Sequence, residues 1–164
     1  ALGAVITTII YVQAATAVLP LPRRLDPTLI QLGGWDGVSR DLEALCLQHG
    51  AGWVASEAYG PASLLAFRAA PGIPVLGAED RWALFGLPAA AVDGFGLLAI
   101  SQRRSEPPDA QYWATAEQIG HVVRTRRAAP DGVEAERFRV YRVTTRPGAR
   151  LVRLPGGRDA PADP

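Results

Sequence analysis

The chain has 164 residues and a mass of 17.4 kDa, with 48% hydrophobic and 20% charged residues. This length and balance fit one globular domain with a sizeable core and exclude a wholly disordered or fibrous protein. The net charge of +1 gives no overall electrostatic argument for nucleic-acid binding. The charge is uneven, because residues 101–164 hold 12 arginines against 8 acids. This excess of 4 positive charges suits either a solvated surface or a position near anionic lipid headgroups.

Two features of composition bear on the origin of the chain. The first residue is Ala1 and no methionine occurs, so we expect a fragment of a longer product or a processed form. Cys46 is the single cysteine, which excludes an intrachain disulfide. Its place in a predicted helix indicates a small buried apolar residue.

The N-terminal segment is the sharpest feature of the charge map. Residues 1–22 contain no acidic or basic side chain, and two arginines follow directly. As a helix, residues 1–19 would span about 28 Å, close to the thickness of a hydrocarbon core. Three interpretations remain open: the end of a transmembrane helix from a polytopic protein, a buried core helix, or a strand. Pro20 and Pro22 are expected to end this element and begin a linker.

The next region alternates between helix and strand patterns. Val38, Leu42 and Leu45 recur at helical spacing, with Asp36 or Ser39 as the N-cap and Gly50 at the C-terminal end. Residues 53–57 then read as a short strand. Pro61 suits the first turn of a second helix, which Gly72 is expected to end.

The alternation continues to residue 101. Residues 75–78 are predicted as a strand, residues 81–85 as a short irregular or helical piece, and residues 96–101 as a buried strand. This βαβ rhythm predicts a three-layer α/β domain with a mainly parallel central sheet.

The last third reads as a hairpin and a tail. Ile119, His121 and Val123 are expected on one strand face, with Arg124 and Arg126 on the other. Residues 137–144 form the second strand, Pro130, Asp131 and Gly132 the connection, and the pair an antiparallel hairpin added to the sheet. The resulting division is an apolar segment at 1–22, a soluble α/β domain at 23–146 and a flexible tail at 147–164.

No strong catalytic signature is present. His49 and His121 have no flanking ligand pattern, so we predict structural histidines and no metal site. A Gly-x-Ser-x-Gly nucleophile elbow is missing, and no glycine cluster forms the loop of a dinucleotide or nucleotide site. We therefore predict neither catalytic residues nor a cofactor within the chain.

Ligand-binding candidates follow the first two predicted strands. They are two acids, a cation and two aromatic residues: Glu57, Tyr59, Asp80, Arg81 and Trp82. Loops at the carboxyl ends of strands in an open α/β sheet converge on a crevice, so we expect these side chains to lie within about 12 Å of one another. Such a set suits a sugar or a sugar phosphate. The alternative is a core tryptophan beside an Asp80–Arg81 ion pair.

The order of these segments resembles a known family. The uncharged N-terminal run is followed by Asp26-Pro27, by Gly34-Trp35 opening a helix, by Glu57-Ala58-Tyr59, and by residues 62–67, 81–85 and 96–98. This succession, over about residues 1–125, is similar to the C-terminal part of bacterial polytopic glycosyltransferases. These integral-membrane enzymes resemble protein mannosyltransferases and aminoarabinose transferases, which take a sugar from a polyprenyl-phosphate donor.

The resemblance implies a non-catalytic, extracytoplasmic (periplasmic) accessory domain at the cell membrane. The family's catalytic acid lies in the membrane part, and no residue of this chain matches its motif. Its partners would be the membrane domain of the same polypeptide, the lipid surface and a polyprenyl-phosphate sugar, with no nucleic acid. The alternative is a soluble ligand-binding or small enzymatic α/β domain whose N-terminal run is a core helix.

Overall fold

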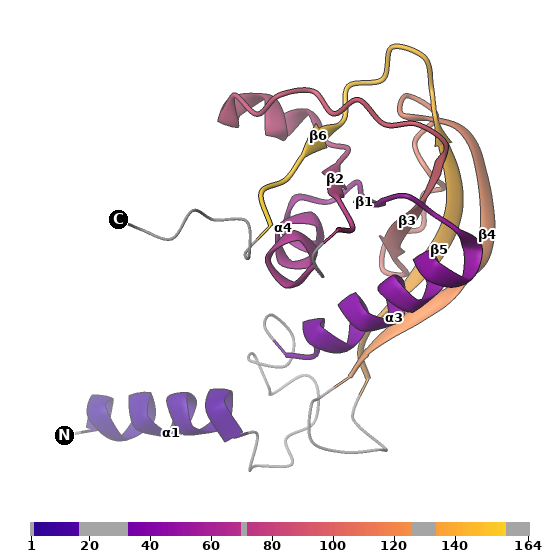
Figure 1. Ribbon diagram of the computed structural model, residues 1–164. Helices are drawn as coiled ribbons and strands as arrows, with labels where there is room; N and C mark the ends of the chain where they lie inside the picture. The colour runs from indigo at the N-terminus through magenta and orange to yellow at the C-terminus, as the bar shows by residue number, and fades with distance from the viewer. Residues whose placement is uncertain (1, 17–32, 70–71, 126–133, 157–164) are drawn as a thin grey trace.

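The computed structural model describes residues 2–16, 33–69, 72–125 and 134–156 (Figure 1). Its helices are α1 (Leu2–Thr16), α3 (Trp35–His49), α4 (Tyr59–Arg68) and the 3₁₀ helix η2 (Asp80–Phe85). Its strands are β1 (Val54–Ser56), β2 (Val75–Gly77), β3 (Phe95–Ser101), β4 (Trp113–Thr125), β5 (Glu134–Thr145) and β6 (Val152–Arg153).

The strands form one mixed sheet in the order β4-β5-β3-β1-β2-β6. Strand β1 pairs parallel with β2 and with β3, whereas the β4–β5, β5–β3 and β2–β6 pairs are antiparallel. The prediction of a mainly parallel three-layer α/β domain is therefore wrong. The βαβ rhythm describes only the short central strands, and the longest strands of the sheet lie outside it.

The antiparallel character comes from the long strands β4 and β5. They have 13 and 12 residues and curve along one side of the domain, as Figure 1 shows. Strand β5 lies between β4 and β3, so the predicted antiparallel pair β4–β5 is two of the six described strands and joins the sheet through β5. Register shifts in β4, one of them between Gln118 and Gly120, change which side chains face inward.

The predicted alternation of β4 holds for His121 and Val123 against Arg124, whereas Ile119, beyond the register shift, packs on the same core as Val122. Val122 and Arg124 are buried, whereas His121 is exposed. Burial of Arg124 is possible because Nη2 donates to Glu136 Oε2 at 3.2 Å and Nη1 donates to the Gly33 carbonyl at 2.6 Å. Arg126 and the expected connection at residues 130–132 lie outside the described residues.

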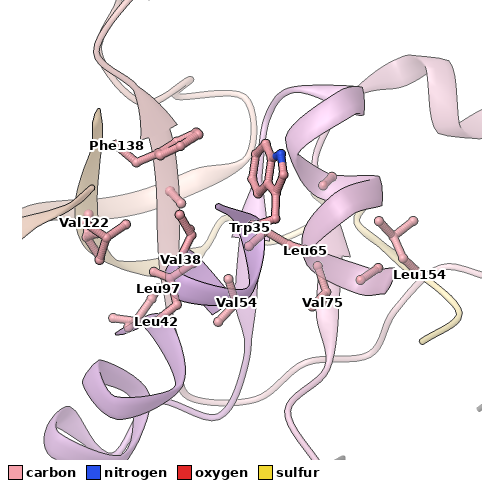
Figure 2. Packing of buried hydrophobic residues seen from close by; sticks show 14 of the residues in the cluster. Trp35, Val38, Leu42, Val54, Leu65, Val75, Leu97, Val122, Phe138 and Leu154 are labelled. Carbon is pink, nitrogen blue, oxygen red and sulfur yellow. The ribbon is translucent and has the colours of Figure 1, made fainter. Parts of the chain in front are cut away.

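Helices α3 and α4 cover one face of the sheet. Their apolar positions, which include Val38, Leu42 and Leu65, pack on Val54 and Leu97 from the strands (Figure 2). The core cluster extends across the sheet from Val122 and Phe138 to Val75 and Leu154; Figure 2 labels these residues. Alternate strand residues face this layer, which is the arrangement that a period of two requires.

The opposite face has a second core without a helix in the described part of the chain. Its aromatic residues are Trp53, Tyr112, Trp113 and Tyr141, and the rings of Trp53 and Trp113 are stacked with centroids 6.0 Å apart. The coil between β3 and β4 supplies Tyr112. In the described residues this face therefore lacks the second helical layer that a three-layer domain would have.

Helix α3 begins at a close approach to β4. Gly34 is the N-cap with φ of 81°, and a Cβ there would overlap the backbone carbonyl of Thr125. No side chain caps this end, so the prediction of Asp36 or Ser39 as the cap is wrong. Gly50 ends the helix in the left-handed region, as predicted, with φ of 68°.

The start of the expected flexible tail is also ordered. Strand β6 pairs antiparallel with β2 in the register Leu76↔Arg153, and Leu151, Val152 and Leu154 are buried. For these residues the prediction of a loose tail is wrong, because the alternating apolar side chains fill both cores. Residues 157–164 lie outside the described residues.

The N-terminal segment is helical as α1, which contradicts the strand interpretation. Side chains 2–12 are all exposed, including Leu2, Ile6, Ile9 and Ile10, and Gln13 is buried. Within the described ranges, no helix combines the length and the apolar character needed to span a membrane. Pro20, Pro22, Asp26-Pro27 and both arginines of the predicted linker lie outside those ranges.

Candidate ligand-binding site

The five ligand-binding candidates follow the carboxyl ends of the neighbouring strands β1 and β2. Strands β1 and β2 are parallel neighbours in the register Ser56↔Gly77, so Glu57 and the residues that follow Gly77 emerge on the same side. Asp80, Arg81 and Trp82 form the first turn of η2, and Tyr59 begins α4. The contacts of these side chains divide them into two groups.

The first group is an aromatic stack with a cation at its border. The rings of Tyr59 and Trp82 are stacked with centroids 4.6 Å apart, and the Arg81 guanidinium lies 5.5 Å from the centre of the Tyr59 ring. Arg81 pairs with Glu79 at 3.3 Å. The alternative Asp80–Arg81 ion pair is not found among the described contacts. Trp82 is buried and packs into the core beneath α4, which leaves it little surface for a ligand.

The second group is bound by the coil that precedes β4. Glu57 Oε1 accepts hydrogen bonds from Trp113 Nε1 at 2.7 Å and from the Asp109 backbone N–H at 2.8 Å. Asp80 Oδ1 accepts a hydrogen bond from the Tyr112 hydroxyl at 3.0 Å. Both acids therefore hold the coil against the edge of the sheet. Asp109, Tyr112 and Trp113 were not among the predicted site residues, because nothing local connects them to β1 or η2.

An open groove of about 440 Å³ lies beside this second group. Three segments line it: Asp80 from η2, Gln111 and Tyr112 from the coil, and residues 146–150 from the turn after β5. A hydrogen bond from Arg146 Nη1 to the Ala110 carbonyl, at 2.8 Å, joins the turn to the coil. Of the five predicted residues, only Asp80 lines this groove.

Tyr112 acts in the groove as a hydrogen-bond donor. Burial of the phenol, followed by its hydrogen bond to Asp80 and the nearby carboxylates, raises the pKa of Tyr112 to about 12. The hydroxyl is therefore protonated at neutral pH and cannot serve there as a base.

The other side chains that could perform chemistry are Ser56, Cys46 and the two histidines. The Ser56 hydroxyl donates to the Ala99 carbonyl at 3.2 Å. Burial of the Cys46 thiol, with a smaller contribution from Glu43, raises its pKa to about 11, so the nucleophilic thiolate is scarce at neutral pH. His49 and His121 are both exposed. Across the described ranges, no group of three or more His, Cys, Asp and Glu side chains is placed to hold a metal ion.

Comparisons with protein-family models, with curated proteins and with solved structures found no match for this chain. The resemblance to polytopic glycosyltransferases consequently has no independent relative to support it.

Proposed function

We propose that this chain is a membrane-attached, extracytoplasmic accessory domain of an integral-membrane glycosyltransferase that uses a polyprenyl-phosphate sugar donor. The observation that carries the proposal is the exposed apolar surface of α1. This helix has no charged side chain, and its side chains 2–12 are exposed, among them seven large apolar or aromatic ones. Folded proteins rarely leave so much contiguous apolar surface in water, and a lipid environment would cover it.

The order of elements supports the same proposal. An apolar helix precedes α3, and the alternation of β1, α4, β2, η2 and β3 follows the succession of segments on which the family resemblance was based. Ser56 and Cys46 are used in the interior, which agrees with a domain whose role is positioning or binding and not chemistry. In this proposal the reaction takes place in the membrane part of the same polypeptide.

A soluble ligand-binding domain is the second candidate, and the groove beside Asp80 and Tyr112 favours it. In that interpretation α1 would be a core helix. The exposure of side chains 2–12 argues against this placement. The two candidates differ in whether the chain binds lipid, which makes lipid binding the deciding test.

Vesicle flotation of the purified full chain tests the proposal. We expect the chain to float with phosphatidylcholine vesicles and with vesicles that also contain phosphatidylglycerol. The variant Ile6→Asp/Ile10→Asp should stay at the bottom of the gradient, because each charge placed in hydrocarbon costs about 2.5–3.5 kcal/mol. Leu47→Asp is the matched control, since Leu47 is an exposed apolar residue on α3, and this variant should float like the parent chain.

The proposal fails if the parent chain remains unbound in both vesicle types. It fails equally if the Ile6→Asp/Ile10→Asp variant floats as well as the parent. A circular dichroism spectrum of each variant ensures that only folded proteins are compared.

A further inference from the structure

The groove beside η2 has the side chains of an anion site with hydroxyl-binding groups next to it. Its lining includes two guanidinium groups, Arg146 and Arg150, and one carboxylate, Asp80. The formal charge of these three groups is +1, and the amide of Gln111 and the hydroxyl of Tyr112 add neutral polar groups. A volume of about 440 Å³ is within the usual range for small-molecule pockets.

The groove is fixed in shape by contacts between its three walls. The Arg146 backbone N–H donates to the Tyr112 carbonyl at 2.8 Å, and Arg146 Nη1 donates to the Ala110 carbonyl at 2.8 Å. The third wall is Asp80 of η2, whose Oδ1 accepts a hydrogen bond from the Tyr112 hydroxyl at 3.0 Å. A turn closed by the Ala149 N–H and the Arg146 carbonyl, with Gly148 at φ of 83°, then presents Arg150.

Arg150 is the cation most available to a ligand. It is exposed, and within the described part of the chain its guanidinium makes no hydrogen bond or ion pair with a carboxylate or a carbonyl. A guanidinium matches a phosphate or carboxylate with two parallel hydrogen bonds. Asp80 and Gln111 are neighbours in the lining, with Gln111 Nε2 donating to Asp80 Oδ1 at 3.5 Å, and their carboxylate and amide groups suit vicinal hydroxyls.

We propose that this groove binds an anionic sugar, which is a sugar ring carrying a phosphate or a carboxylate. Arg150 and Arg146 take the charged group, while Asp80 and Gln111 take ring hydroxyls. This inference does not depend on the membrane role, because a soluble ligand can reach an open groove whether or not α1 binds lipid. Its failure and the failure of the flotation experiment are therefore separate results.

The test is a titration of the full chain with small-molecule probes in neutral detergent, with binding monitored by NMR through the amide chemical shifts of the chain. The probes are glucose 1-phosphate, glucuronate, methyl glucoside and inorganic phosphate. We expect glucose 1-phosphate, glucuronate or both to bind at least about tenfold more tightly than methyl glucoside and inorganic phosphate. The first two probes distinguish a phosphate from a carboxylate as the charged group.

Three variants assign the interaction to the groove. Arg150→Gln should weaken binding of the preferred anionic sugar about tenfold, the effect of losing a charge-assisted hydrogen bond. Gln111→Ala should weaken it about threefold and leave inorganic phosphate unchanged. Arg153→Gln is the matched control, because Arg153 is an exposed arginine on β6 and does not line the groove, and its affinity should equal that of the parent.

Several results would overturn the proposal. One is the absence of binding by both anionic probes. Another is inorganic phosphate binding as tightly as glucose 1-phosphate, which would indicate a site for small anions only. Equal losses in Arg150→Gln and Arg153→Gln would show that binding follows net charge and not the groove.

Discussion

The carboxylate of Glu57, one residue after β1, accepts a hydrogen bond of 2.7 Å from the indole N–H of Trp113, the first residue of β4. The two residues are 56 positions apart in the chain. Both are buried, and Glu57 Oε1 also holds the Asp109 backbone N–H at 2.8 Å. This interaction fixes the coil that forms one wall of the groove.

We predict that Trp113→Phe lowers the free energy of unfolding by about 2 kcal/mol. A charge-assisted hydrogen bond contributes about 1.5–3 kcal/mol, and the ring that remains keeps most of the packing on Trp53. Urea unfolding measures the change. Glu117→Gln, at an exposed position of β4, is the control and should change stability by less than about 0.5 kcal/mol. A double-mutant cycle with Glu57→Gln that shows no coupling would contradict a direct interaction.

The Tyr112 phenol should titrate at high pH. Burial of the phenol, followed by its hydrogen bond to Asp80, raises its pKa to about 12 in the folded chain, above the ordinary value of 10.0, so the stability that comes from the protonated form is complete below pH 10. That contribution to stability should disappear as the pH rises from 10 to 12. The difference in phenolate absorbance between the parent and Tyr112→Phe measures this titration. An ionisation of Tyr112 at or below pH 10 would contradict the burial of the phenol together with its hydrogen bond to Asp80.

Gly34→Ala should destabilise the domain while Gly37→Ala should not. Gly34 has φ of 81°, where a side chain costs about 1–3 kcal/mol, and its Cβ would also overlap the Thr125 carbonyl. Gly37 lies inside α3 with open space around its Cβ, so alanine there should add about 0.5–1 kcal/mol of stability. Thermal unfolding of the two variants compares them directly. Equal melting temperatures would contradict the contact between α3 and β4.

The Arg124–Glu136 pair should be costly to break from one side. Glu136→Ala removes one carboxylate from the guanidinium of Arg124, whose side chain is only 1% exposed, and we expect a loss of about 3–5 kcal/mol. Replacing both residues by leucine should cost less than replacing Glu136 alone, because no buried charge remains. Chemical denaturation of the single and double variants checks this order. A double variant less stable than Glu136→Ala would contradict it.

The central strands could be predicted from sequence because their signals are local. Short apolar runs around Val54, Leu76 and Leu97 are bounded by glycine and proline, and each lies within a strand of the structure. Sheet direction is a different kind of property. Whether neighbouring strands are parallel or antiparallel depends on the position of β5 in the sheet. The sequence of β5 does not indicate that β3 is its neighbour.

Burial of charged residues limited the prediction further. The alternation of β4 did not show that Arg124 faces the core, because arginine is rarely buried; Glu136 and the Gly33 carbonyl allow it to face inward. In the same way, Glu57 and Asp80 were identified as strand-end residues from position alone. Their partners Trp113 and Tyr112 come from a coil that only the folded chain brings to that edge.

Sugar transfer from a polyprenyl-phosphate donor is the measurement that tests the central claim most directly. Membranes that contain the complete product of the gene encoding this chain are compared with membranes to which only residues 1–164 have been added. The proposal predicts donor-dependent transfer by the complete product and none by the 164-residue chain alone. Transfer by the chain alone, or no transfer by the complete product with any polyprenyl-phosphate sugar, would contradict it.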